Sequence, residues 1–215
     1  MRLILLGPPG VGKGTQGARL SQALSVPSVS TGALLRALIA TGNETPRVQE
    51  ARQILSGAFV SDTFANQLAY EAIQAQTGFV LDGYPRSVGQ AVALEAFLLE
   101  RGTALDAVFL LRISDQVLAG RVAGRRVCSE CGATYHLVIA PPRQEGHCDL
   151  CGGGLALRPE EDQPEKRFLR RQLYETQTAP VCAFYQERGL LREIDAEGLP
   201  EVVYNKICES LSGLI

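Results

Sequence analysis

The sequence predicts an α/β fold: a doubly wound, five-stranded parallel sheet with helices on both of its faces. Three observations lead to this prediction. Five short apolar segments have the composition of strands, helical patterns lie between them, and a glycine-rich loop joins the first segment to the first helix. Strands that alternate with helices form parallel sheets, because each crossover returns the chain to the same edge of the sheet.

The five candidate strands are short and mostly aliphatic. Residues 3–6 form an uninterrupted aliphatic run that ends at Gly7, as expected of a strand that is buried on both faces. Segments 79–81, 107–111 and 190–194 are similar, and segment 27–30 is a weaker candidate. Apolar residues recur with helical spacing in a stretch that ends at Leu24 and in residues 65–76 and 88–101.

Two segments interrupt this alternation. Residues 30–60 have helical patterns and no strand, so they form a helical insertion. Residues 125–162 contain four cysteines, both histidines and three consecutive glycines, but too few apolar residues to build a core. Such a segment needs another means of stabilisation. We therefore expect a core domain of residues 1–29, 61–124 and 163–215 that carries both insertions.

Composition excludes several classes of protein. Hydrophobic residues make up 46% of the 215 positions and charged residues 20%, which excludes wholesale disorder. The formal net charge of −2 argues against a general nucleic-acid-binding or membrane-binding surface. No apolar run approaches the ~18 residues of a membrane span, and the N-terminus reads as a strand rather than a signal peptide. We expect a cytosolic, globular protein.

Arginine is unusually frequent relative to lysine. The chain has 18 arginines and three lysines, and nine of the arginines fall between Arg112 and Arg171. Guanidinium groups suit bidentate phosphate binding and keep their charge when desolvated. Codon bias together with ordinary solvated helices explains the same excess, so composition alone leaves both interpretations open.

The glycine-rich loop predicts a nucleotide phosphate site. The loop comprises residues 7–15, Gly-Pro-Pro-Gly-Val-Gly-Lys-Gly-Thr, and lies between the first strand and the first helix. Its glycines allow successive N–H groups to turn inward, and the helix N-terminus adds its dipole. Lys13 is expected to reach the transferring phosphates. The loop matches the P-loop pattern except that Gly14 stands where Ser or Thr normally binds Mg²⁺, and Thr15 follows one place later.

The four cysteines of the second insertion predict a structural zinc site. Cys128, Cys131, Cys148 and Cys151 form a C-x₂-C-x₁₆-C-x₂-C pattern, with a glycine after each pair. Two such turns can present four thiolates tetrahedrally, which Zn²⁺ prefers. Iron or another soft metal is the alternative, and His147 is a possible competing ligand. Disulfides are disfavoured in a reducing cytosol. Cys182 and Cys208, in helical patterns, are expected to be buried and inert.

Asp82 ends the third candidate strand, at the edge where α/β sheets bind ligands. A carboxylate beside the nucleotide phosphates is expected to hold Mg²⁺, in part through the waters of the ion, because Mg²⁺ dehydrates reluctantly. A helix-capping or turn aspartate is the structural alternative.

Taken together, these motifs resemble the adenylate kinases. The resemblance rests on the loop of residues 7–15, on Ser30-Thr31-Gly32 with Arg36, on Asp82-Gly83-Tyr84-Pro85-Arg86 with Gln90, and on Gly124-Arg125-Arg126, and it covers essentially the whole chain. It implies reversible, Mg²⁺-dependent transfer of the terminal phosphate of ATP to AMP, which gives two ADP. It also implies an AMP-binding arm at 30–60, a zinc-binding lid at 125–162 and a monomer.

The resemblance also assigns residues to the two nucleotides. For ATP it implies Gly10, Val11, Gly12, Lys13, Gly14, Thr15, Arg121, Arg125, Thr134, Tyr135 and Leu199. For AMP it implies Thr31, Arg36, Ala58, Phe59, Val60, Gly83, Tyr84, Pro85, Arg86, Gln90, Arg158 and Arg170. The amide of Gln90 offers both a donor and an acceptor to an adenine edge. One extra residue after Arg158 leaves Arg171 as an alternative to Arg170.

No nucleophilic side chain is needed for this chemistry, because the phosphate of AMP is already an anion. Catalysis then consists of positioning and charge neutralisation, which we expect from Lys13, Asp82, Arg86, Arg125, Arg158 and Arg170. Arg121 and Arg125 lie four residues apart and share a helix face if the helix continues that far. Ala33 stands where relatives commonly have an aspartate, which leaves Asp82 to handle the metal alone, and Ala58 stands where they often have a lysine.

Two other functions compete with this interpretation. A related kinase that uses UMP or CMP as acceptor has the same loop and arginines, because acceptor choice depends on a few contacts. A cysteine ribbon with nearby arginines also suggests a nucleic-acid-binding module. That class predicts a basic domain with interleaved aromatic residues, whereas the ribbon here contains only Tyr135.

Overall fold

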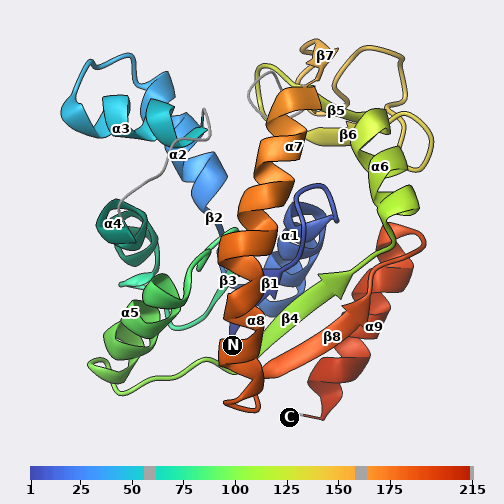
Figure 1. Ribbon diagram of the computed structural model, residues 1–215. Helices are drawn as coiled ribbons and strands as arrows, with labels where there is room; N and C mark the ends of the chain where they lie inside the picture. Colours follow the sequence, from blue (N-terminus) through green and yellow to red (C-terminus); the bar gives the residue numbers. More distant parts are fainter. Residues whose placement is uncertain (56–61, 158–163, 214–215) are drawn as a thin grey trace.

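The computed structural model describes residues 1–55, 62–157 and 164–213, and it has the predicted α/β architecture. A five-stranded parallel sheet has the order β2-β3-β1-β4-β8. Figure 1 shows this sheet between two layers of helices. Its strands are β1 (Arg2–Leu6), β2 (Ser28–Ser30), β3 (Phe79–Asp82), β4 (Ala107–Arg112) and β8 (Leu191–Asp195).

Alternate residues of the central strands face two separate hydrophobic cores. Ile4 and Leu6 pack on one side against α4 (Asp62–Ile73), α5 (Val88–Leu99) and α8 (Ala179–Gln186). Leu3 and Leu5 pack on the other side against α1 (Lys13–Leu24) and α9 (Pro200–Ser212). The aliphatic run of the first strand therefore fills both cores, as its composition predicts.

The first insertion forms a helical arm. It consists of α2 (Thr31–Ala40) and α3 (Pro46–Leu55), which lie against each other and share a small core with α4 through Leu35, Ala51, Phe64 and Leu68. Ser30, the last residue of the predicted strand 27–30 and the first of the predicted insertion, ends β2 and pairs with Asp82. Its side chain caps α2 by accepting a hydrogen bond from the N–H of Ala33.

The second insertion forms a small β module, here called the cysteine module (residues 125–157). An antiparallel sheet of order β6-β5-β7 joins β5 (Arg125–Cys128), β6 (Thr134–His136) and β7 (Leu155–Ala156). The module follows α6 (Asp115–Gly124) and precedes α7 (Pro164–Leu173), which continues through the π-helical segment η1 (Tyr174–Thr178) into α8. The sequence predicts the cysteine turns of this module but not its strands.

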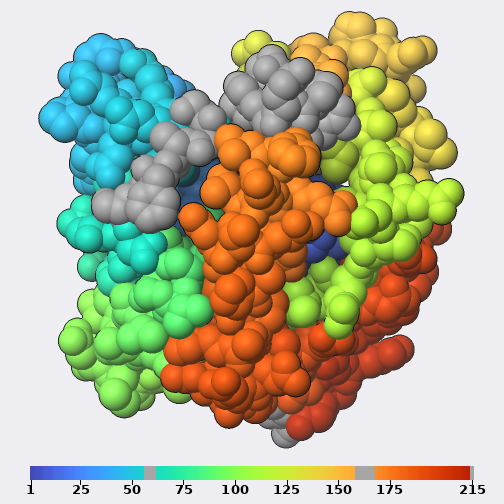
Figure 2. Space-filling view, in the orientation of Figure 1, coloured from blue at the N-terminus to red at the C-terminus, as the bar shows by residue number. Residues whose placement is uncertain are grey.

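The arm and the cysteine module project from the same end of the sheet (Figure 1). Figure 2 shows them as two separate projections, the arm in blue to cyan and the module in yellow. Dark-blue atoms of the first residues of the chain are visible in the hollow between α7 and α6 (Figure 2). Among the helices that the structure describes, none has the length and apolar character that crossing a membrane requires.

Candidate active site

Three connections that follow neighbouring strands meet at the carboxyl edge of the sheet. The glycine-rich loop follows β1, helix α2 follows β2, and the turn of residues 83–86 follows β3. The register places Asp82 of β3 beside Leu5 of β1 on one side and beside Ser30 of β2 on the other. Ligands bind at this edge in open α/β sheets. The fold therefore brings together the motifs that the sequence separates by up to 80 residues.

The glycine-rich loop has the backbone of a phosphate cradle. Gly10 and Gly12 have φ values of +90° and +109°, a region that residues with a Cβ rarely adopt. A Cβ on Gly10 would also clash with Cγ2 of Val122. The Nζ of Lys13 donates hydrogen bonds to the carbonyls of Gly7 and Pro8, at 2.8 and 3.0 Å. The lysine ammonium thus lies over its own loop, at the start of α1.

Asp82 lies next to the N-terminus of α1. A Cβ built on Gly14 would be 3.4 Å from Oδ2 of Asp82, so the carboxylate faces the position where a P-loop usually has Ser or Thr. A Cβ at this position would make an ordinary van der Waals contact with the Asp82 carboxylate. The capping alternative for Asp82 receives no support, because Asp82 is the last residue of a strand and a helix does not follow it directly.

The turn after β3 collects the expected acceptor-site residues. Thr31, which is 5% exposed, donates a hydrogen bond from Oγ1 to the carbonyl of Gly83 at 2.9 Å. The Nε of Arg86 donates to the same carbonyl at 2.7 Å. The guanidinium of Arg36 lies beside Gly32, where a Cβ would be 3.4 Å from Nη1. Thr31 and Arg86 therefore meet at Gly83, and Arg36 lies beside Gly32, the residue that follows Thr31.

Tyr84 and Gln90 differ from the other members of this group because their side chains are buried. Tyr84 is fully buried, and its hydroxyl donates a hydrogen bond to Oδ1 of Asn66 at 2.7 Å. Burial raises the pKa of the Tyr84 phenol far above its ordinary value. The phenol is therefore part of the core, and only the backbone of Tyr84 is available to a nucleotide.

The amide of Gln90 is 6% exposed and already has two partners in the protein. Its Oε1 accepts a hydrogen bond from the N–H of Arg86 at 2.7 Å, and its Nε2 donates to Oδ1 of Asp62 at 2.8 Å. Ser87 caps α5 by accepting from the N–H of Gln90. The donor and acceptor of Gln90 are predictable from the residue type, whereas the contact with Asp62, across 28 residues, has no local sequence signal.

Arg121 holds two loops together. Its guanidinium donates to the carbonyl of Val11 at 2.8 Å and to the carbonyls of Ala196 and Gly198, each at 2.7 Å. Desolvation lowers the pKa of this guanidinium. These bonds tie the glycine-rich loop to the segment just before Leu199, whose side chain is 55% exposed. Leu199 thereby lies on a loop anchored beside the phosphate cradle.

Arg121 and Arg125 would share a helix face only if α6 continued as far as Arg125, and it does not. Helix α6 ends at Gly124, and Arg125 is the extended first residue of β5, paired with His136. The backbone of Gly124 lies against the imidazole ring of His136, and its carbonyl accepts a hydrogen bond from the N–H of Leu137 at 2.9 Å. Arg125 thus belongs to β5 of the cysteine module, whereas Arg121 lies on α6.

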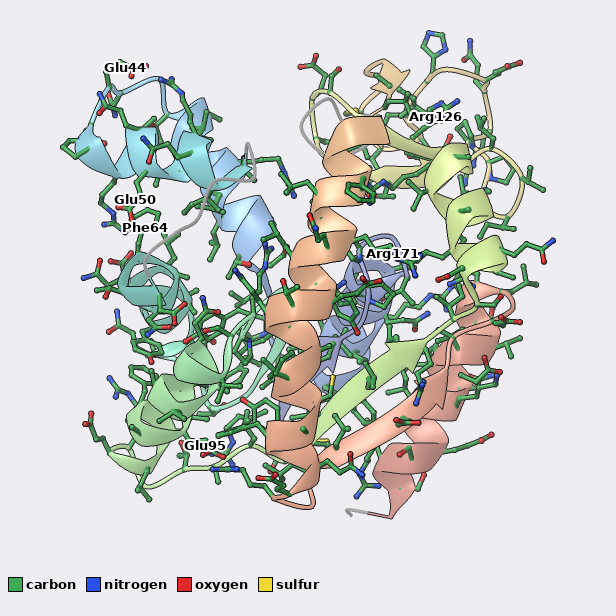
Figure 3. All side chains as sticks on the ribbon, in the orientation of Figure 1. Glu44, Glu50, Phe64, Glu95, Arg126 and Arg171 are labelled. Atoms are coloured by element: carbon green, nitrogen blue, oxygen red, sulfur yellow. The ribbon has the colours of Figure 1, made fainter. Side chains whose placement is uncertain are left out.

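Two adjacent arginines on α7 have different surroundings. Arg171 donates to Asp115 of α6 at 2.9 Å and to Glu175 at 2.8 Å. These hydrogen bonds raise the pKa of its guanidinium. Arg171 extends from α7 in Figure 3, and its charge is matched by two carboxylates. Arg170 is half-buried. The expected site residues Ala58, Phe59, Val60 and Arg158 lie outside the described residues.

The cysteine module brings its four thiols together. The Sγ atoms of Cys128, Cys131, Cys148 and Cys151 all lie within 4.8 Å of one another, and two of the separations are 3.4 and 3.5 Å. A tetrahedral ion with bonds of about 2.3 Å requires sulfur separations of about 3.8 Å, so the cluster fits Zn²⁺. His147 is directed elsewhere, since its Nδ1 lies 3.0 Å from the carbonyl of Glu145.

The two cysteine turns have the same construction. Gly132 and Gly152 have φ values of +74° and +77°, and their N–H groups donate to the carbonyls of Cys128 and Cys148. Tyr135 supports the second turn, because its hydroxyl lies 3.4 Å from Sγ of Cys148 and accepts from the N–H of Asp149 at 2.8 Å. The hydrogen bond from Tyr135 lowers the pKa of Cys148 to about 6. Thiolate, the form that binds metals, is thus favoured there.

Two expected positions on β6 and two cysteines in helices differ in their surroundings. Tyr135 has its hydroxyl at the cysteine cluster, whereas Thr134, beside it on β6, is exposed. Cys182 and Cys208 were expected to be buried, but both are half-buried. Desolvation raises the pKa of Cys182, as expected of an unreactive thiol.

Comparison with known proteins gives a consistent result. The family model "Adenylate kinase" matches residues 5–190. A protein of Symbiobacterium thermophilum named adenylate kinase is 46% identical over 198 residues, which cover 90% of each chain. Proteins with the same name from Moorella thermoacetica and Clostridium tetani are 42% identical over 207 residues (94% of each chain) and 38% identical over 218 residues (the full length of both).

Proposed function

The chain belongs to the adenylate kinase family, and on this premise we propose how its residues hold two nucleotides and move a phosphoryl group between them. As a member of this family it is a phosphotransferase that uses nucleotides. The observation that carries the proposal is the β1–β3 register. Because Leu5 and Asp82 are neighbours, the glycine-rich loop and the turn of residues 83–86 open onto the same edge of the sheet.

The donor, ATP, is placed over the glycine-rich loop. Residues 10–15 present backbone N–H groups and the N-terminus of α1 to its phosphates. The ammonium of Lys13 exchanges the carbonyls of Gly7 and Pro8 for phosphate oxygens. The base and ribose of ATP are assigned to Thr134, Tyr135 and Leu199. Arg121 acts by holding the Leu199 loop against Val11.

The acceptor, AMP, is placed at the turn after β3. Arg36 and Arg86 hold its phosphate, Thr31 and Gly83 form the floor, and Gln90 meets the base. Arg86 and Thr31 are already fixed on the Gly83 carbonyl, so little conformational freedom is lost when the acceptor binds. Ala58, Phe59, Val60, Pro85 and Arg158 are assigned to this nucleotide by the family pattern alone.

Transfer requires charge neutralisation rather than a nucleophilic side chain. Lys13, Arg86, Arg125, Arg158 and Arg170 surround the transferring group and stabilise the charge that spreads over its oxygens. The family pattern assigns Arg170 to this group, and Arg171, which two carboxylates hold, is the alternative. Asp82 is the residue that would hold Mg²⁺, and the ion would supply positive charge that neutralises the phosphates.

The two insertions serve as covers for these sites. The arm (30–60) closes over AMP. The lid (125–162), which includes the cysteine module, closes over ATP. Closure of both excludes water as a competing acceptor. Four thiolates leave no open position on a Zn²⁺ ion, so the metal supports the lid and takes no part in transfer. A reducing cytoplasm keeps these thiols available, and we place the protein there as a monomer.

The acceptor is tested by supplying ATP and Mg²⁺ with AMP, UMP, CMP or GMP and measuring diphosphate formation. The proposal predicts that AMP is by far the best acceptor and that two ADP form for each AMP consumed. Negligible turnover of AMP beside rapid turnover of UMP or CMP would instead identify the pyrimidine-specific alternative. Metal analysis of the same preparation is expected to give one zinc per chain.

A further inference from the structure

We propose that Asp62 is a positioning residue that selects the acceptor base by fixing the orientation of the Gln90 amide. The proposal rests on the function proposed above, in which Gln90 meets the base of AMP. Asp62 is the first residue of α4 and lies outside every motif of the sequence analysis. Its role is argued from the contacts that it makes with α5.

A closed set of hydrogen bonds connects Asp62 to Gln90. Oδ1 of Asp62 accepts from Nε2 of Gln90 at 2.8 Å, and Oδ2 accepts from Oγ of Ser87 at 2.9 Å. Oγ of Ser87 in turn accepts from the N–H of Gln90 at 3.1 Å. On its other side, Oε1 of Gln90 accepts from the N–H of Arg86 at 2.7 Å. Both ends of the amide are therefore held.

The chemistry of these partners determines which way the amide points. The two ends of an amide are nearly equal in size, so packing does not distinguish them. A carboxylate can only accept a hydrogen bond and a backbone N–H can only donate one. Reversing the amide of Gln90 would place a donor against the N–H of Arg86 and an acceptor against Asp62. Since Gln90 is 6% exposed, water cannot replace the lost bonds.

A fixed amide reads one order of donor and acceptor on a base. After the two internal bonds, Gln90 keeps one N–H on Nε2 and one lone pair on Oε1. Adenine presents an amino donor at position 6 beside an acceptor at N1. Hypoxanthine and guanine present the reverse, an acceptor at position 6 beside a donor at N1. The amide orientation that suits AMP would place its donor against the N1 donor of IMP or GMP and its acceptor against the acceptor at position 6. Asp62 maintains this orientation and so disfavours both nucleotides.

Gly89 provides a way to move the Asp62 carboxylate without removing it. A Cβ on Gly89 would lie 2.8 Å from Oδ2 of Asp62, which is too close for both to remain in place. The φ of Gly89 lies outside the positive region, and alanine is a better helix former than glycine. Gly89→Ala therefore displaces the carboxylate while its helix is retained.

The experiment compares Asp62→Ala, Gly89→Ala, Gln90→Ala and the Asp62→Ala/Gln90→Ala double variant. Glu100→Ala is the control, since it removes an exposed carboxylate at the opposite end of α5. KM for AMP, KM for ATP, kcat, and kcat/KM for AMP and IMP are measured for each. We expect Asp62→Ala to raise KM for AMP about tenfold, the usual effect of losing a hydrogen bond to a charged group. The preference for AMP over IMP is expected to fall by a similar factor, and KM for ATP to stay within about twofold.

The coupling between the two positions distinguishes a positioning role from a structural one. If Asp62 acts through Gln90, Asp62→Ala adds nothing to KM for AMP once Gln90 is alanine, whereas a merely structural effect adds in full. Gly89→Ala is expected to change KM for AMP and the AMP/IMP ratio in the same direction, and it replaces Asp62→Ala if that variant does not fold.

Two results overturn the proposal and are distinguishable from each other. If Gln90→Ala raises KM for AMP but neither Asp62→Ala nor Gly89→Ala changes the AMP/IMP ratio, Asp62 has no positioning role and the acceptor site stands. If Gln90→Ala itself leaves KM for AMP unchanged, the assignment of Gln90 to the base fails, and the role of Asp62 fails with it.

Discussion

Replacing Lys13 with alanine separates the catalytic from the structural contribution of the glycine-rich loop. The Nζ of Lys13 makes two hydrogen bonds, to the carbonyls of Gly7 and Pro8, in a half-buried position. Hydrogen bonds from a charged group contribute about 1.5 kcal/mol each at the lower end, which applies at a partly exposed site, and alanine avoids the loss of about 2 kcal/mol of rotamer entropy that an immobilised lysine undergoes on folding. The free energy of unfolding should therefore fall by about 1 kcal/mol, a Tm decrease of about 2–4 °C.

The expected loss of activity is far larger. Removing one preorganised donor from a transition state costs about 10²–10³ in kcat, or about 2.7–4 kcal/mol. We expect a fall of at least this size in kcat for Lys13→Ala, because a full positive charge is lost beside the transferring phosphates. ADP formation from ATP and AMP gives kcat, and thermal unfolding gives Tm.

Lys206 supplies a matched control. Its Nζ also makes two hydrogen bonds, to the carbonyl and to Oδ2 of Asp195, but on α9. Lys206→Ala should leave kcat unchanged and lower Tm by no more than Lys13→Ala does. A Lys13→Ala variant with normal kcat, or one that loses activity only by unfolding, would refute the assignment of the phosphate cradle.

Two further changes test the metal cluster and the core beneath the acceptor turn. Cys128→Ser is expected to lower the zinc content below one ion per chain and to lower Tm. The control, Cys208→Ser on α9, is expected to keep the metal. A full zinc complement in the Cys128 variant would contradict the proposed ligation. Tyr84→Phe removes the hydrogen bond from the buried Tyr84 hydroxyl to Asn66. The free energy of unfolding should fall by about 1–1.5 kcal/mol, and Tm by about 2–6 °C. An unchanged Tm in calorimetry would show that the bond is not stabilising.

Much of the fold follows from local features of the sequence. The run at residues 3–6 predicts a strand buried on both faces, and Leu3 and Ile4 do enter opposite cores. The spacing of the four cysteines predicts their clustering, because two short turns suffice to bring four thiols together. The glycine-rich loop is equally legible, since its backbone conformation requires glycine at fixed positions. In each of these cases the determining contacts lie within a short segment.

What the sequence does not reveal depends on contacts between distant segments. The close approach of the Gly124 backbone to the ring of His136 connects the end of α6 to β6, twelve residues later. The amide orientation of Gln90 follows from Asp62, and the anchoring of the Leu199 loop follows from Arg121. Local pattern and propensity contain no signal for such side-chain contacts, which arise only once the chain has folded.

Binding of a two-headed nucleotide tests the central claim most directly. Two adenosines joined by a chain of five phosphates can occupy the donor and acceptor sites together only if both open onto one edge of the sheet. Calorimetry is expected to show one such molecule bound per chain, displaced by ATP and by AMP, and bound far more weakly by Lys13→Ala. Absence of binding, or displacement by ATP alone, would contradict a site in which two nucleotides face each other.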